Sequence, residues 1–315
     1  MEIKLLSHHE IDRQVWDDFM RTSPLGALYG VGAYLDIIRP QWEAVVVQDG
    51  EQWIAVMPWF AESRFGLTRM IQPLLCQFQG IYWGPYPSEP YKQYEWKRKV
   101  VGMMAEFVNK HCKVFHGNFS PGFDYPLPFH WEGFQLSPRF TYYLNLKDPI
   151  PAFSERHQRS IKKNNASAVR LVLNGDGGQF MTALHSNLDK KGVKFSEKQY
   201  SDIEQIMKTF IPGSEAYLLE CTDQEGNWLS GMLVYAYKGT FTYYLGASSV
   251  LGRKENSMTW LMNEAIQLAL SKGADIFDFE GSMIQNVETF FRGFGAKPKL
   301  FFEISKNLKL AKFVR

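Results

Sequence analysis

Two halves of the chain repeat one order of sequence patterns, and this repeat restricts the fold more than any other feature. In the first half, an amphipathic helical stretch leads into KVFHGNF (113–119) and then into WEGFQLSPRFTYYLNL (131–146). In the second half, another such stretch leads into DIFDFEG (275–281) and then into FRGFGAKPKLFFEIS (291–305). Self-similarity of this kind indicates an internal duplication. Two unrelated units of helix and strand could also produce it by coincidence.

The duplication predicts two domains of similar size. A chain of 315 residues is long for one typical domain and fits two. The run Lys-Asp-Pro-Ile-Pro (147–151) lies between the halves and has the composition of a linker. We therefore expect an N-terminal domain over residues 1–147 and a C-terminal domain over residues 148–315.

Within each half, helical patterns come first, strand-like runs follow, and a long helix leads into a further strand. In the first half, the turn Asp49-Gly50 joins two apolar runs and predicts a hairpin. In the second half, Ser257–Lys272 places its apolar side chains on one face, and Gly273 stands where a helix ends. An antiparallel meander framed by helices in this order is that of the GNAT fold. The predicted fold class is α/β (α+β), with two tandem GNAT-like domains, each a mixed, mostly antiparallel twisted sheet flanked by helices.

Composition argues against several classes of function. The net charge is only +2, which disfavours nucleic-acid binding by bulk charge but leaves a local basic face open. The histidines show no metal-ligand spacing, so we expect no metal site. Cys76, Cys112 and Cys221 are far apart, which favours a reducing compartment. The start of the chain lacks the apolar core of a signal peptide, and no run approaches the roughly 20 apolar residues of a membrane span. We therefore expect a cytoplasmic protein.

Segments of the second half resemble the FemABX family. They are RHQRSIKKN (156–164), YYLGASS (243–249), TWLMNEAIQLALSKGADIFDFEGS (259–282) and FFRGFGA (290–296). The resemblance implies two GNAT-like domains and the transfer of amino acids from aminoacyl-tRNA onto peptidoglycan precursors. The loop LGRKENS (251–257) departs from the [RQ]-x-x-G-x-[GA] pattern of CoA-dependent GNAT enzymes, which argues against CoA binding. The segment 149–213 is too short for the coiled-coil arm that some members carry.

Three catalytic candidates lie near the end of the second half. Arg292 stands at the basic position of the family's F-[KR]-x-x-F-G pattern, and the resemblance implies that it holds a substrate phosphate or stabilises an oxyanion. A surface arginine before a Gly-Phe-Gly turn is the alternative. Asp278 and Glu280 alternate with phenylalanines, so both carboxylates are predicted on one strand face. There, one of them could accept a proton from the attacking ammonium. A carboxylate at this place could instead bind the acceptor amine or cap the following helix.

A basic helix and nearby cleft positions are the candidates for substrate binding. The cations that share one helical face or lie beside it are Arg156, Arg159, Lys162 and Lys163. Such a face could bind a diphosphate or an RNA backbone, and a solvated helix side is the alternative. The remaining candidates are Tyr244, Asn256 and Ser282. For Tyr244 the alternative is core packing, and for Ser282 it is a helix N-cap.

These features support one leading hypothesis and two alternatives. The first is an aminoacyltransferase that moves an aminoacyl group from aminoacyl-tRNA to an amine of a nucleotide- or lipid-linked cell-wall precursor. Direct attack without a cofactor is expected, because no covalent-nucleophile motif is present. One alternative is an acyl-CoA-dependent N-acyltransferase on an amino sugar or small amine, and the other is a non-catalytic GNAT-like binding protein. The basic tail over residues 306–315 could touch anionic lipid, or could simply form a surface helix.

Overall fold

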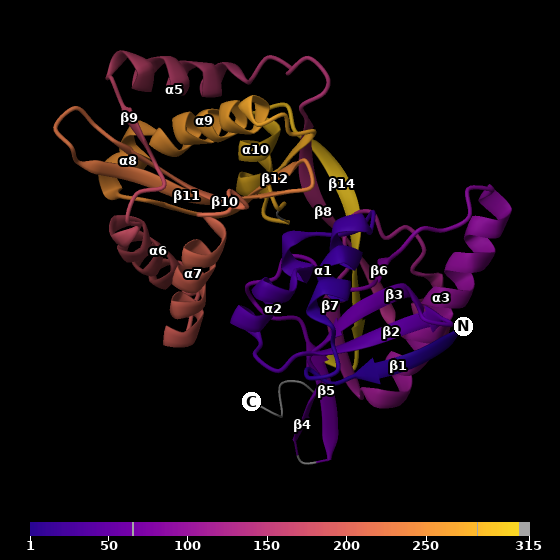
Figure 1. Ribbon diagram of the computed structural model, residues 1–315. Helices are drawn as coiled ribbons and strands as arrows, with labels where there is room; N and C mark the ends of the chain where they lie inside the picture. Colours follow the sequence, from indigo (N-terminus) through magenta and orange to yellow (C-terminus); the bar gives the residue numbers. More distant parts are fainter. Residues whose placement is uncertain (65, 282, 309–315) are drawn as a thin grey trace. The chain divides into compact units, whose positions relative to one another are not determined.

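The computed structural model describes residues 1–64, 66–281 and 283–308, which pack into two compact units. The first unit comprises Met1–Arg139 and the described residues from Leu300 onward, and the second comprises Phe140–Lys299. Each unit combines twisted, mostly antiparallel strands with helices, as Figure 1 shows. The mixed, helix-flanked sheets predicted from the sequence are therefore present in both units.

The compact units divide the chain differently from the sequence-based division at residue 147. Strand β8 (Gln135–Asn145) begins in the first unit and ends in the second. Strand β14 (Lys297–Lys306) begins in the second unit and carries the chain back into the first. A division into two continuous domains takes no account of this return, because the local pattern of a strand does not tell which strand it will pair with.

The first unit contains two sets of strands. One set is antiparallel and has the order β1 (Glu2–Leu6), β2 (Glu43–Asp49), β3 (Gln52–Trp59) and β6 (Tyr82–Trp83). The other set has the order β4 (Glu62–Arg64), β5 (Leu67–Ile71), β7 (Val114–Asn118) and β14, and here β5 and β7 are parallel. The predicted hairpin joins β2 to β3, and Gly50 has a φ of 61° at its tip, a value that glycine adopts without strain.

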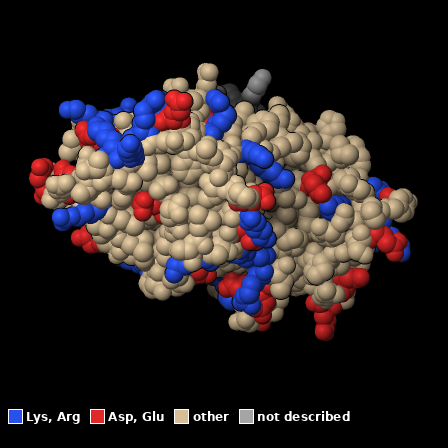
Figure 2. Space-filling view, turned by 90° about the horizontal axis from the view of Figure 1, so that it is seen from above, with Lys and Arg blue, Asp and Glu red and all other residues tan. Residues whose placement is uncertain are grey.

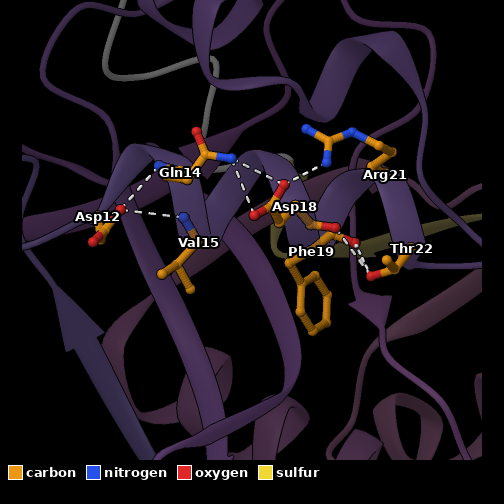
Figure 3. A network of polar contacts seen from close by, with 7 residues as sticks. All are labelled: Asp12, Gln14, Val15, Asp18, Phe19, Arg21 and Thr22. Carbon is orange, nitrogen blue, oxygen red and sulfur yellow. Dashed lines mark hydrogen bonds and ion pairs between the residues drawn. The ribbon is translucent and has the colours of Figure 1, made fainter.

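Among the helices of the first unit, α1 (Arg13–Thr22) begins at a side-chain cap supplied by Asp12. The others are the short 3-10 helix η1 (Leu28–Gly30), α2 (Gly32–Ile38), α3 (Pro90–His111) and α4 (Leu127–Trp131). At the start of α1, Oδ1 of Asp12 accepts the backbone N–H groups of Gln14 at 2.9 Å and Val15 at 3.2 Å (Figure 3). On the exposed side of α1, Asp18 accepts from the side chains of Gln14 and Arg21. A cap of this kind typically contributes about 1 kcal/mol.

The second unit is built on one sheet. Its strands have the order β8, β13 (Ile276–Asp278), β12 (Thr240–Ser248), β11 (Trp228–Tyr237), β10 (Ala216–Thr222) and β9 (Arg170–Leu173). β12 and β13 are parallel, and the other neighbours are antiparallel. Its helices are α5 (Glu155–Ala166), α6 (Gly178–Lys190), α7 (Glu197–Phe210), α8 (Val250–Glu255), α9 (Ser257–Ser271) and α10 (Gln285–Arg292). No helix in the described ranges of either unit is both long and apolar enough to cross a membrane.

Helices cover both faces of this sheet. α9 packs against β10, β11 and β12, and α5 packs against α9. α6 and α7 lie against the opposite face (Figure 1). The buried side of α9 carries Leu261, Met262, Ala265 and Ala269, as its periodicity predicts, and Gly273 ends the helix with a φ of 69°. The layer of α9 and α5 is the one that positions the candidate site.

Candidate functional site

One buried histidine fastens the start of α5 to the end of α10. Ser154 caps α5, and its hydroxyl oxygen lies 2.8 Å from Nδ1 of His157. Nε2 of His157 lies 3.0 Å from the carbonyl oxygen of Phe290. A carbonyl oxygen only accepts, so Nε2 carries the proton and Nδ1 accepts from the hydroxyl of Ser154. The two partners therefore fix the tautomer of the ring.

The chain that follows α10 encloses this ring. His157 is 6% exposed and meets the ring of Phe294 edge-on, with ring centroids 4.4 Å apart. A Cβ added at Gly293 would lie 2.4 Å from the imidazole, so only glycine fits against it. Burial lowers the pKa of His157, and the hydrogen bond to the Phe290 carbonyl opposes that shift only in part. The imidazole is neutral and holds the two helices in one arrangement.

α5, α8, α10 and the first turn of α9 surround a pocket of about 670 Å³. Its charged lining side chains are Arg156 from α5, Arg253 from α8 and Arg292 from α10. None of the described residues that line it is acidic. Three guanidinium groups from three helices give the pocket a strongly positive potential, which attracts an anion.

The three guanidinium groups differ in how firmly they are held. One Nη of Arg253 donates to the carbonyl oxygen of Ser248 at 2.7 Å and to Oδ1 of Asn187 at 3.0 Å. Nε of Arg292 donates to Glu288 at 2.8 Å, and its side chain is 64% exposed. Arg156 is exposed and makes no ion pair with any described residue. The pocket thus has one guanidinium held by two protein acceptors, one paired with Glu288 on its own helix, and one, that of Arg156, without an ion pair to the described residues.

The N-terminus of α9 adds to this potential. Asn256, Met258 and Thr259 line the pocket, and Asn256 precedes the helix in the left-handed conformation with a φ of 54°. The side chain of Asn256 does not cap α9. Because the first N–H groups of a helix point outward along its axis, this end favours negative charge.

Comparison with known proteins identifies the fold. No protein-family model matches the sequence, and a search of curated proteins finds no relative. Among solved structures, FemX matches over 100% of both chains, with a TM-score of 0.70 and 13% sequence identity. This chain has the FemX fold. A tandem GNAT protein from the clavulanic acid biosynthesis pathway matches 96% of this chain and 98% of its own, with a TM-score of 0.55 and 13% identity. The L-PGS of Bacillus licheniformis matches 94% of this chain and 92% of its own, with a TM-score of 0.58 and 11% identity. The prediction of two GNAT-like domains is confirmed.

In this FemX fold, the predicted basic face of α5 reaches the pocket at one end only. Arg156 lines it, whereas Lys162 is exposed and does not. Nζ of Lys163 forms an ion pair with Glu255 at 2.5 Å, and Arg159 lies 3.4 Å from Glu155 one turn earlier in α5. Figure 2 views the molecule from the side of α5 and shows Lys and Arg gathered on this part of the surface. The first turn of α5 therefore borders the pocket, and the other cations of the helix point to solvent or to α8 while its remaining side packs on α9.

Tyr244 belongs to the core of the second unit. It is 8% exposed and stacks on Tyr235 of the neighbouring strand, with ring centroids 4.3 Å apart. It does not line the pocket. Ser282, the other predicted cleft residue, lies outside the described residues. α10 begins at Gln285, with Ile284 at the N-cap position.

The carboxylates of Asp278 and Glu280 do not lie on one face of a strand as predicted, because β13 ends at Asp278. Oδ1 of Asp278 accepts from the hydroxyl of Thr141 at 2.5 Å and from the backbone N–H of Glu280 at 2.9 Å. Glu280 has a φ of 58°, which is left-handed rather than extended. Burial raises the pKa of Asp278 to about 7 and raises that of Glu280 well above its ordinary value. Neither residue lines the pocket.

Sequence reasoning missed two residues of the site. His157 stands among charged residues in the sequence, where it reads as one more polar position, but it is buried. Arg253 lies in the segment 251–257, whose sequence departs from the glycine pattern of CoA-dependent enzymes and which folds as α8. A signal for Arg253 was present, because a cation in the turn directly before a helix N-terminus adds to the anion-attracting field of that helix. The local pattern does not show that His157 is buried, since Phe290 and Gly293, which enclose its ring, are distant in the sequence.

Proposed function

We propose that this protein is an acyl- or aminoacyltransferase that holds a phosphate-bearing donor in the arginine-lined pocket of the second unit. The observation that carries the proposal is the convergence of Arg156, Arg253 and Arg292 at the N-terminus of α9. A guanidinium group matches two phosphate oxygens with parallel hydrogen bonds, and the helix end contributes further positive potential. The FemX fold supports the transferase class.

The segment before α9, which forms the short helix α8, favours aminoacyl-tRNA over acyl-CoA as the donor. Its backbone N–H groups are used internally: Gly252 donates to Oγ of Ser249 at 2.9 Å, and Arg253 donates to the carbonyl oxygen of Ser249 at 3.1 Å. A Cβ at Gly252 would lie 2.0 Å from the carbonyl oxygen of Leu229, so this glycine serves close packing. A donor must then be held by side chains, as the phosphodiester groups at the 3′ end of a tRNA would be.

The chemistry that we propose is direct attack within a ternary complex. The acceptor nitrogen attacks the carbonyl carbon of the ester and a C–N bond forms. The ester C–O bond breaks, the nitrogen loses a proton, and the ester oxygen takes up a proton and leaves as the terminal ribose hydroxyl of the tRNA. Arg292 is the proposed stabiliser of the negative charge that develops on oxygen. Asp278 and Glu280, the proton acceptors expected from the sequence, lie outside the donor pocket, so we propose that the acceptor amine approaches from the turn after β13. Burial raises the pKa of Asp278 to about 7, which makes its carboxylate a stronger base.

The acceptor that we propose is the amine of a nucleotide- or lipid-linked cell-wall precursor. The resemblance of the second half to the FemABX family supports this choice. We also propose that the reaction occurs in the cytoplasm, where aminoacyl-tRNA is present. Cys76, Cys112 and Cys221 are all free and buried, which agrees with a reducing compartment.

The test is a transfer assay on pocket variants with a matched control. Labelled aminoacyl-tRNA and a UDP-linked muropeptide are supplied in one arm, and acetyl-CoA with the same acceptor in the other. Arg156→Ala and Arg292→Ala should each weaken donor binding by tenfold to a hundredfold, since a charge-assisted hydrogen bond contributes roughly 1.5–3 kcal/mol. Arg159→Ala, on the same helix as Arg156 but outside the pocket, should leave binding unchanged.

Three outcomes would contradict the proposal in different ways. Full activity of both pocket variants would remove the pocket from the mechanism. Consumption of acetyl-CoA at the expense of aminoacyl-tRNA would establish the acyl-CoA alternative. Binding of precursor without turnover of either donor would establish the non-catalytic alternative.

A further inference from the structure

The first unit has a groove of its own, of about 530 Å³, between α3 and α4. One face of α3 forms its floor, and Pro128 and Trp131 of α4 form one side. The volume is in the range of small-molecule sites. Nothing in the proposed transferase mechanism uses this groove, and every residue that lines it belongs to the first unit.

Trp131 presents an open aromatic surface to the groove. Its side chain is 59% exposed, whereas Trp16, Trp42 and Trp83 of the same unit are fully buried. Its ring makes no stacking or cation contact with any described residue. A tryptophan buries more area than any other side chain when it is enclosed, so a ring left open beside a cavity indicates a surface that a ligand covers.

Gly102 leaves the floor of the groove open. It lies inside the 22-residue helix α3, where glycine is unfavourable relative to alanine. A Cβ at this position would meet no atom of the described residues within 4 Å, so packing against them does not explain the glycine. The same stripe of α3 carries Glu95 and Arg98 before Gly102 and Glu106 after it. At Gly102 the backbone of α3 is therefore uncovered, between the charged side chains of Arg98 and Glu106.

The charges around the groove are mixed. Glu95, Glu106 and Glu132 line it together with Arg98 and Lys99. Carboxylates therefore outnumber cations, which disfavours a phosphorylated ligand. Mixed acceptors and donors suit a ligand whose hydroxyl groups both donate and accept.

We propose that this groove binds an uncharged pyranose ring of a saccharide, with Trp131 as the stacking platform. The C–H face of a pyranose is apolar and packs on an indole, while the hydroxyl groups on its edge reach the carboxylates and the guanidinium of the rim. Gly102 allows the ring to approach the backbone of α3. The proposal is independent of the donor pocket and goes beyond the proposed transfer reaction.

Saturation-transfer NMR and calorimetry on the full-length protein test it, with cellobiose, lactose and N,N′-diacetylchitobiose as probes and uridine 5′-monophosphate as the charged control. The expected result is saturation of the pyranose C–H protons by at least one disaccharide and none for the nucleotide. Trp131→Ala should weaken that binding roughly threefold to tenfold, and Trp131→Phe should weaken it less.

Gly102→Leu separates binding from folding. The new side chain should raise the melting temperature by about 2–4 °C, because leucine is a better helix former and meets open space, yet it should abolish saccharide binding by filling the floor. The proposal is overturned if no probe binds the wild type at millimolar concentration, if Trp131→Ala binds as well as the wild type, or if folded Gly102→Leu does. Preferential binding of the nucleotide would assign the groove to an anionic ligand instead.

Discussion

Replacing His157 measures how strongly the second unit depends on the link between α5 and α10. The ring has two hydrogen-bond partners, the hydroxyl of Ser154 and the carbonyl oxygen of Phe290, and Phe294 packs on it. His157→Ala removes all three contacts and leaves the Phe290 carbonyl without its donor. The cavity and the unpaired carbonyl together should cost roughly 3–5 kcal/mol of unfolding free energy. This is a large part of the 5–15 kcal/mol typical of a domain.

Two amide variants divide this cost. His157→Gln can place its NH₂ group where Nε2 lies and keep the bond to Phe290, so it should lose about 1–2 kcal/mol. His157→Asn reaches only Ser154 and should lose more. Chemical denaturation of the full-length protein gives the three free energies, and binding of a phosphate-bearing donor gives the second readout. If the link positions Arg156 against Arg292, donor affinity should fall in the same order as stability.

The pH dependence provides an independent check with a fixed sign. The folded pKa of His157 is lowered, so below the unfolded value of about 6.5 the unfolded chain binds more protons than the folded one. Stability should therefore fall as the pH drops from about 6.5 toward the folded pKa, and His157→Gln should remove this component. A wild type whose stability is flat over this range, or a His157→Ala variant as stable as the wild type, would refute the reasoning.

Two further substitutions test the turn after β13. Asp278→Asn keeps the acceptor for Thr141 and Glu280 but removes a buried carboxylate whose pKa is raised to about 7, so thermal unfolding at pH 8 should show a gain of roughly 2–4 kcal/mol over the wild type. That gain should shrink to about 0.5 kcal/mol near pH 4 and vanish below about pH 3, where the wild-type carboxyl is protonated in both the folded and the unfolded state. Loss of turnover in this more stable variant would support a catalytic role, and loss of stability at pH 8 would contradict the assignment. Gly281→Ala should cost roughly 2–4 kcal/mol, because φ is 64° and the new Cβ would lie 2.2 Å from the Phe140 carbonyl oxygen. Gly133→Ala is the control for backbone strain alone, because its φ is 81° and the new Cβ would meet open space, and it should cost only about 1 kcal/mol of unfolding free energy. Equal losses of unfolding free energy for the two variants would show that the contact with the Phe140 carbonyl is not a constraint.

The fold was predictable where local chemistry alone decides an element. The periodicity of α9 and the glycine after it gave a helix with the right buried side, and Asp49-Gly50 gave the hairpin. The path of strand β14, which begins in the second unit and ends in the first, was not predictable in this way. Residues 297–306 read as a strand from their composition, but only the completed sheet shows that they pair with β7.

In the candidate site, too, the sequence predicts some residues correctly and fails where the local backbone conformation decides. Arg292 and Arg156 were found through family-like segments, and both line the pocket. The argument for Glu280 failed at a specific step, because alternation of side chains holds only while the backbone is extended, and the chain turns left-handed there. Asp278 accepts the N–H of Glu280 across that turn, and a sequence pattern of period two carries no information about such a bond.

The FRGFG segment shows why a motif and a function are separate questions in this fold. Gly293 is required by the ring of His157, and Phe294 packs on the same ring. At Gly295 a Cβ would lie 2.2 Å from Pro151, and φ is 81°. These residues are therefore explained by packing, and a protein with no activity would still need them to close α5 against α10. Arg292 is the exception, since it is 64% exposed and directed at a pocket with two other arginines. The convergence of three guanidinium groups, rather than the motif, is what argues for a bound anion and hence for a transfer reaction.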